Sequence, residues 1–218
     1  MNSLISVGFC NSTNVDSFSG KVFKLLVANE KTTLQVHEKV LSSSSEFFKR
    51  AVKPEWAESR PDPNSIDMSE HSLEDVKLYL HWLYERTLPL AHDAHGIGTY
   101  RTLTNAYVFG EKVVDVQYKN CVLLSLIAAM KQIGSYPEYM AINTIYEKTP
   151  VGSPARRLMR DIYASRADGK GAKWQSQFNH LNQEVLVDII TEMSKVRLAL
   201  ETSVWHEKPG SYIEGNST

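Results

Sequence analysis

The stretch VFKLLVANEKTTLQVHEKVLSSSSEFF, at residues 22–48, changes from a two-residue period to a helical period within one short segment. Residues 22–27 are rich in strand formers and residues 32–36 alternate apolar and polar side chains, so the two runs predict a β-hairpin with its turn at 28–31. The apolar side chains that follow recur at helical spacing: Val36, Val40, Leu41, Phe47 and Phe48. They predict a short helix and a further helical turn directly after the hairpin.

Three blocks of sequence, taken in order, resemble the BTB/POZ family. The first is the strand-to-helix pattern that begins at Val36-His37 and ends at Phe47-Phe48, and the second is Ile66-Asp67-Met68 followed by a helical block at 73–84. The third covers residues 103–121, and the whole resemblance covers roughly residues 21–132. It implies an α+β fold in which a small sheet, made of the hairpin and a short third strand, is flanked by short helices and followed by an all-helical C-terminal extension.

The chain is expected to divide into four parts. Gly134 and Pro137 end a helical pattern and mark the main boundary. The parts are a flexible N-terminal segment at 1–20, a BTB/POZ-like domain at 21–134, a helical extension at 135–203 and a flexible tail at 204–218. The layout is similar to that of the compact BTB proteins common in filamentous fungi.

Within the BTB-like part, the prolines of residues 53–64 predict a loop that leads to a short strand at 65–68. Ser72, with Asp75 three residues later, is expected to cap the helix at 73–84. Leu78 and Trp82 form a second apolar stripe on this helix, which needs another helix or chain as cover. The face expected to be buried contains Leu73, Val76, Leu80 and Leu83. Further helices are expected at 99–113 and 116–133.

The extension is expected to contain three helices. One lies at 138–147, a second begins at Ser153 with Pro154 in its first position, and a third runs from residue 182 to about residue 201. Residues 166–173 are polar and rich in glycine, which predicts a mobile loop. The apolar stripe expected on the third helix contains Leu186, Ile189, Ile190, Met193 and Val196.

Composition favours a protein partner over a nucleic acid or a membrane. The 218 residues are 42% hydrophobic and 22% charged, with a formal net charge of −1, so no long-range attraction to polyanions is expected. The N-terminus lacks the pattern of a signal peptide, and no run reaches membrane-spanning length. The two cysteines suit a reducing compartment, cytoplasm or nucleus, and Cys121 is expected to be a buried small hydrophobe.

Candidate chemical sites are few. His92 and His95 could share a metal ion, but the sequence nearby supplies no further ligands, so a solvated loop is favoured. Arg156, Arg157 and Arg160, with Lys170 and Lys173, could form a basic patch, which keeps a nucleic-acid-associated regulator as a distant alternative. No Ser, His and Asp set indicates catalysis, and no cofactor is expected. His37 is expected to satisfy free backbone groups at the start of a helix.

The resemblance implies two family uses, homodimerisation and recruitment of a cullin ubiquitin-ligase scaffold. The charged pair typical of dimerising members falls on Val22 and Glu38, and the family's hydrophobic-x-Glu triplet falls on Val76-Lys77-Leu78, so neither signature is kept. We therefore expect a non-enzymatic interaction module that binds itself or another protein. The alternative is a cullin adaptor whose extension holds the client. The residues expected to contact a protein partner are Val22, Phe23, Leu78, Tyr79, Trp82 and Tyr84.

Overall fold

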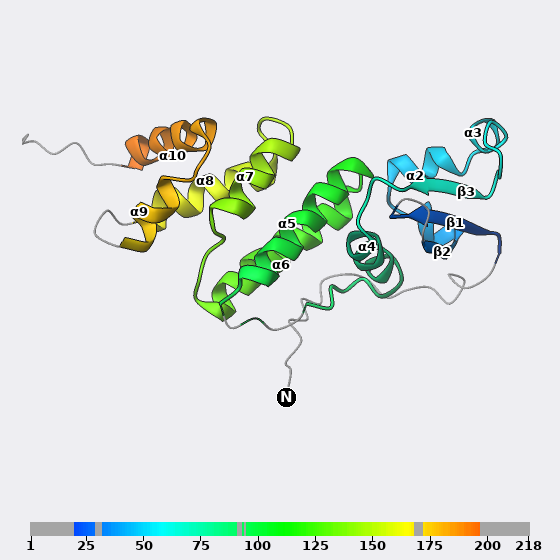
Figure 1. Cartoon of the computed structure of the whole chain (residues 1–218), viewed down its shortest axis with the longest axis horizontal. Helices are drawn as coiled ribbons and strands as arrows, with labels where there is room; N and C mark the ends of the chain where they lie inside the picture. The colour runs from blue at the N-terminus through cyan, green and yellow to red at the C-terminus, as the bar shows by residue number, and fades with distance from the viewer. Residues whose placement is uncertain (1–19, 29–31, 91–92, 94, 168–171, 197–218) are drawn as a thin grey trace, which may run out of the picture.

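The computed structural model describes residues 20–28, 32–90, 93, 95–167 and 172–196. Figure 1 shows an elongated molecule with a small sheet and its neighbouring helices at one end, a long helical pair in the middle and the helices of the C-terminal extension at the other end. The turn residues 29–31, residues 1–19 and residues 197–218 are outside the described part, and with them the predictions of flexible ends. None of the helices in the described part has both the length and the apolar character needed to cross a bilayer.

The predicted hairpin and third strand form one three-stranded sheet. Strand β1 (Val22–Val27) pairs antiparallel with β2 (Thr32–His37) and parallel with β3 (Ser65–Met68), giving the order β2-β1-β3. Side chains alternate along β1, so that Phe23, Leu25 and Val27 are buried while Lys24 faces solvent. One face of the sheet therefore covers the core and the other is open.

Three short helices follow the hairpin. They are α1 (Glu38–Leu41), α2 (Glu46–Ala51) and α3 (Pro54–Ala57). Helix α3 corrects the prediction that residues 53–64 form only a loop. Pro54 occupies the first helical position, where its missing N–H has no intrahelical partner to lose and its fixed φ suits the helix.

Helix α4 (Leu73–Glu85) begins as predicted at Ser72, whose Oγ accepts a hydrogen bond from the backbone N–H of Asp75 at 3.1 Å. The predicted buried face is wrong in part, because Leu73 and Leu80 are only partly buried. The fully buried side chains of α4 are Val76, Tyr79, Trp82 and Leu83. Both sets fit helical spacing, and the aromatic set lies inward because its rings pack against those of Phe48 and Tyr118.

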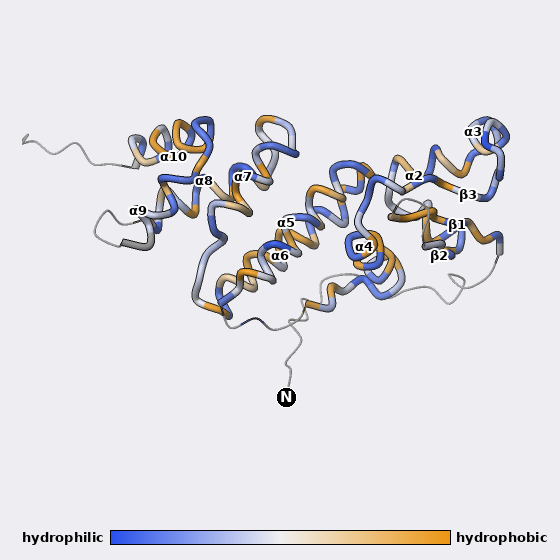
Figure 2. The backbone as a smooth tube through the Cα atoms, in the orientation of Figure 1, coloured by the Kyte–Doolittle hydropathy of each residue, from blue (hydrophilic) through white to orange (hydrophobic). Residues whose placement is uncertain are grey.

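A helical pair, α5 (Ile97–Lys112) and α6 (Val116–Ile133), forms the middle of the molecule. Hydrophobic and hydrophilic segments alternate along both helices, as expected of helices that bury one face (Figure 2). Helix α6 has the predicted bounds. It starts at Asp115, whose side chain accepts from the backbone N–H of Tyr118, and ends at Gly134 with φ +73°, a conformation that glycine adopts without strain.

The described residues of the extension form four helices, whereas three were predicted. These are α7 (Tyr139–Lys148), α8 (Pro154–Arg166), α9 (Ala172–Phe178) and α10 (Gln183–Val196). Ser153 caps α8 as predicted, accepting from the backbone N–H of Arg156 at 3.3 Å. The prediction of a loop over 166–173 is wrong at both ends, because α8 includes residue 166 and α9 begins at residue 172; residues 168–171 lie outside the described part.

The buried face of α10 also differs from the predicted stripe. Val185 and Ile189 are buried, together with Leu181 before the helix, whereas Ile190 is largely exposed. The buried residues of the extension join those of the BTB-like part in one cluster, in which Ile142 and Tyr146 of α7 take part. A domain boundary at residue 134 therefore stays a prediction, since packing continues across it.

Candidate interaction surface

Two of the six predicted contact residues lie at the start of β1. Val22 is partly exposed on the open face of the sheet, whereas Phe23 is fully buried. The same face carries the partly exposed Leu26 and polar side chains, among them Lys24, Gln35 and Asp67. The hairpin thus presents a mostly polar surface rather than an apolar one, because its apolar side chains are those that cover the core.

The other four predicted contact residues lie on α4. Tyr79 and Trp82 are fully buried, so a partner cannot reach them without opening the domain, while Leu78 and Tyr84 are partly exposed. The Tyr79 hydroxyl donates to Asp115 Oδ2 at 2.8 Å. Burial, and next the adjacent Asp115 carboxylate, raise the pKa of Tyr79 well above its ordinary value, so the hydroxyl stays a donor.

Tyr84 has a structural partner in His37. The Tyr84 Oη accepts from the backbone N–H of His37 at 3.1 Å and lies 2.8 Å from its Nδ1. The His37 side chain makes no capping hydrogen bond to α1, so the predicted backbone-capping role is wrong in its mechanism. His37 instead connects the end of β2 to the end of α4.

Asp115 is the polar centre of this part of the core. It is fully buried and accepts from three donors, the hydroxyls of Ser44 and Tyr79 and the backbone N–H of Tyr118 at 3.0 Å. It thereby joins the α1–α2 turn, α4 and the N-terminus of α6. Nothing in the sequence pattern singled out this residue, since an isolated Asp before a helix indicates only a cap.

An apolar hollow, missed by the sequence analysis, lies among α2, α3, β3 and the turn between α5 and α6. Its volume is about 520 Å³. Three large apolar side chains at the hollow are exposed: Trp56 by 64%, Val114 by 48% and Phe47 by 38%. Such side chains are usually scattered singly over a surface, so their gathering around one concavity indicates an interaction site. We call this site the Trp56 hollow.

The wall of the Trp56 hollow at Val114 holds an unusual backbone conformation. Val114 has φ +52°, in the left-handed region, which costs a β-branched residue about 1–3 kcal/mol. The carbonyls of Val113 and Val114 accept from the backbone N–H groups of Phe47 and Glu46, at 3.4 and 3.2 Å, and so hold this turn against the start of α2. A strained, exposed valine on a firmly held turn indicates a function at the site.

The rim of the Trp56 hollow carries charges of both signs that are fixed by local contacts. Arg60 donates to the carbonyls of Ser65 and Ala51 at 2.6 and 2.5 Å. A hydrogen bond from Lys49 lowers the pKa of Glu46, and the backbone N–H of Ser69 lowers that of Asp67. An apolar centre with a polar rim is the usual anatomy of a protein-binding surface.

A second concavity, of about 1020 Å³, lies between α4 and α5. Leu78 lies on its wall with polar neighbours that include His81, Arg101 and Asn105. Asp93, at its edge, accepts from the backbone N–H groups of His95 and Gly98 and so caps the start of α5. That arrangement uses Asp93 structurally; His92, the other half of the predicted histidine pair, lies outside the described residues.

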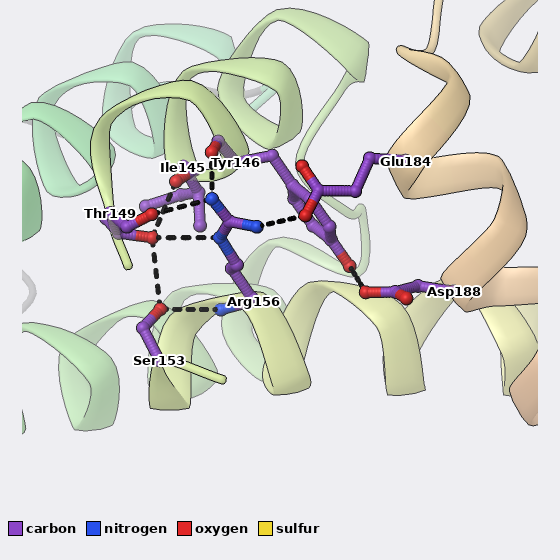
Figure 3. Close-up of polar contacts among 7 residues, drawn as sticks. All are labelled: Ile145, Tyr146, Thr149, Ser153, Arg156, Glu184 and Asp188. Carbon is purple, nitrogen blue, oxygen red and sulfur yellow. Dashed lines mark hydrogen bonds and ion pairs between the residues drawn. The ribbon is translucent and has the colours of Figure 1, made fainter. Parts of the chain in front are cut away.

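The arginines of α8 do not form a free basic patch. Figure 3 shows the buried Arg156 guanidinium among the carbonyls of Tyr146 and Thr149, with Glu184 of α10 2.6 Å from its Nη1. Arg157 donates to a backbone carbonyl at 2.5 Å, and Arg160 makes ion pairs with two acidic side chains. The side chains of Lys170 and Lys173 lie outside the described part.

A mixed three-stranded sheet, surrounded by short helices and bearing an apolar hollow with a polar rim, defines a small α+β protein-binding domain. Residues 20–107 match the BTB/POZ domain, so this part of the chain is a BTB/POZ domain. The predicted family and α+β fold are thus confirmed, and BTB/POZ domains are protein–protein interaction modules. No curated protein matches the chain. Cys121 is buried in α6, as predicted.

Proposed function

We propose that the chain is a non-enzymatic interaction module whose BTB/POZ domain binds a short apolar segment of a different protein in the Trp56 hollow. The observation that supports this function is the exposure of Trp56, Phe47 and Val114 around one concavity. Tryptophan is enriched among the residues that dominate binding energy, because a large ring buries much apolar area at little conformational cost.

The size of the hollow favours a short segment over a second copy of the chain. Ten residues line it, whereas a stable interface between two folded proteins involves about 20–30 residues on each side. One apolar face of an amphipathic helix, with side chains at positions i, i+3 and i+4, suits such a groove. The mixed charges of the rim then select the orientation of the segment more than its affinity.

The two uses implied by the family have less support here. A dimer through β1 would rest on Val22 and the partly exposed Leu26 among mostly polar neighbours. A cullin contact through α4 would rest on Leu78 and Tyr84, since the other two predicted aromatic anchors are buried. A nucleic-acid role has little support, because the three arginines of the predicted basic patch, Arg156, Arg157 and Arg160, are engaged within the chain.

The proposal is tested by selecting displayed amphipathic helical peptides on the purified full chain and measuring their affinity by fluorescence polarisation. We expect Trp56→Ser to weaken the selected peptides at least about tenfold, since loss of a central anchor removes more than about 1.4 kcal/mol. The matched control is Ile190→Ser, which removes an equally exposed apolar side chain on α10. Peptides that bind both variants equally would contradict the proposal.

Two further measurements separate the alternatives. Light scattering over a range of concentrations reports self-association, and a dimer that Trp56→Ser abolishes would replace the foreign segment by a second copy. A pull-down with a purified cullin N-terminal domain reports the adaptor alternative. If the cullin domain binds the Trp56→Ser variant but not the Leu78→Asp variant, the binding site is the groove between α4 and α5 rather than the Trp56 hollow.

A further inference from the structure

A small aromatic cavity lies where α6 gives way to the extension, away from the Trp56 hollow. Its volume is about 210 Å³, and its walls come from the 134–138 connection, α8 and α9. Three aromatic rings line it, those of Tyr136, Tyr163 and Trp174, together with Glu138. The proposed protein-binding function makes no use of this cavity.

The three rings present surfaces in different orientations. The ring centroids of Tyr163 and Trp174 are 5.0 Å apart with planes at 85°, and those of Tyr136 and Trp174 are 6.1 Å apart with planes at 31°. Tyr163 is almost fully buried and donates its hydroxyl proton to the Pro137 carbonyl at 3.1 Å, which fixes the ring. Trp174 and Tyr136 are partly exposed, so one side of the cavity is accessible.

The electrostatics of the cavity favour a cation. Aromatic faces carry the negative part of the ring quadrupole, and Glu138 adds a carboxylate beside them. Burial, and then the charge of Glu138, raise the pKa of Tyr163, which places that carboxylate near the ring. An anion would be repelled here, and a metal ion would find one carboxylate where it needs several oxygen, nitrogen or sulfur ligands.

The chain already holds one cation at the edge of these rings. The Arg166 guanidinium lies over the ring of Tyr136, 5.9 Å from its centroid, close to the outer limit of about 6 Å for a cation–π contact. Arg166 is exposed and is not among the residues that line the cavity. Arg166 therefore contacts the ring of Tyr136 from outside and does not occupy the cavity.

We propose that this aromatic cavity binds a methylated ammonium group, the chemistry shared by methylated lysine side chains and by small molecules such as choline. Such a group is large, weakly hydrated and positively charged, so it gains from several ring faces at once without losing a tight hydration shell. A plain lysine ammonium is strongly hydrated and gains less. The site would thus bind a methylated ammonium group more tightly than an unmodified lysine.

The test is titration of the full chain with a trimethyllysine peptide, the same peptide with unmodified lysine, choline, and a peptide whose trimethylammonium is replaced by a neutral tert-butyl group. Binding is followed by calorimetry and by tryptophan fluorescence. We expect the trimethyllysine peptide or choline to bind at least about tenfold tighter than the lysine and tert-butyl peptides. Binding of the trimethyllysine peptide alone identifies a protein ligand, and binding of choline alone identifies a small molecule.

Variants locate the site and separate it from the Trp56 hollow. Glu138→Gln and Tyr136→Leu change partly exposed positions and should each weaken binding severalfold with the circular dichroism spectrum unchanged. Arg166→Ala should leave binding intact or tighten it, because a competing cation is removed. Trp56→Ser should have no effect, whatever becomes of the proposed peptide site. Equal affinity for the tert-butyl peptide, or no binding of either methylated ligand, would overturn the proposal.

Discussion

Among the described residues, the part of the chain before residue 134 and the helices after it each bury one charged side chain, and the two charges have opposite signs. In the first part, Asp115 lies at the N-terminus of α6 and accepts from hydroxyls and a backbone N–H. In the extension, Arg156 lies at the C-terminus of α7 and donates to the carbonyls of Tyr146 and Thr149. An anion thus accepts from a free N–H group at one helix end, and a cation donates to free carbonyls at another.

The difference between the two sites lies in what else surrounds the charge. Asp115 is fully buried and each of its described hydrogen-bond donors is neutral, whereas Arg156 also pairs with Glu184, whose side chain is 53% exposed. Water can therefore reach part of the Arg156 network but not Asp115. A buried charge held by helix ends needs no opposite charge beside it, since oriented dipoles and hydrogen bonds take that role.

The largest effect is expected for Asp115→Ala. The substitution removes the acceptor of three donors, of which the Tyr79 hydroxyl and the Tyr118 N–H are buried, and this costs about 3–4 kcal/mol of unfolding free energy. Asp115→Asn keeps one acceptor oxygen for the N–H of Tyr118 and should cost about half as much. Urea unfolding of the wild type and the two variants measures these free energies. Equal stability of Asp115→Ala and the wild type would show that the buried carboxylate does not stabilise the fold.

The next effect is expected for Arg156→Leu. The leucine fills part of the volume, but the carbonyls of Tyr146 and Thr149 lose their donors, so we expect a loss of about 2–3 kcal/mol. Circular dichroism and the fluorescence of a BTB-domain tryptophan, followed together during urea unfolding, show whether the two parts unfold as one. One shifted transition indicates a single cooperative unit, in agreement with the continuous core. An earlier transition seen only by circular dichroism indicates that the extension unfolds separately, as a boundary at residue 134 requires.

The parts of the fold that the sequence predicted are those set by local pattern. The hairpin, the strand at 65–68 and the bounds of α6 follow from side-chain period, and the caps Ser72 and Ser153 follow from their neighbours three residues away. These features depend on residues a few positions apart. The BTB/POZ resemblance could be recognised because it consists of several such local patterns in a fixed order.

The candidate site could not be predicted in the same way, because it depends on residues distant in sequence. Trp56 stands in a proline-bounded segment that carries no periodic signal, and the hollow exists only where Val114, more than fifty residues later, folds against α2. Tyr79 was predicted at a contact surface because it is aromatic and lies on α4, but it is buried in the core. Its hydroxyl donates there to Asp115, an acceptor thirty-six residues away that the sequence pattern did not indicate.

A smaller effect is expected for Glu184→Gln. If the carbonyls at the end of α7 are what hold the buried guanidinium, removing the exposed negative charge of Glu184 should cost at most about 1 kcal/mol. Increasing salt should weaken the wild type toward the variant, because an exposed ion pair is screened. A loss as large as that of Arg156→Leu would show that Glu184, and not the end of α7, balances the charge.

The smallest effect is expected at Asp93, which does at the start of α5 what Asp115 does at the start of α6, but in contact with water. The backbone N–H of His95, and next that of Gly98, lower the pKa of Asp93. Because the folded-state pKa lies below the unfolded value of about 3.9, its stabilising contribution is present above that pH and is lost as pH falls through the folded pKa. The difference in urea midpoint between wild type and Asp93→Asn should therefore be constant from about pH 6 to pH 5 and shrink below about pH 4. A difference that persists unchanged at low pH would show that Asp93 acts through its shape rather than its charge.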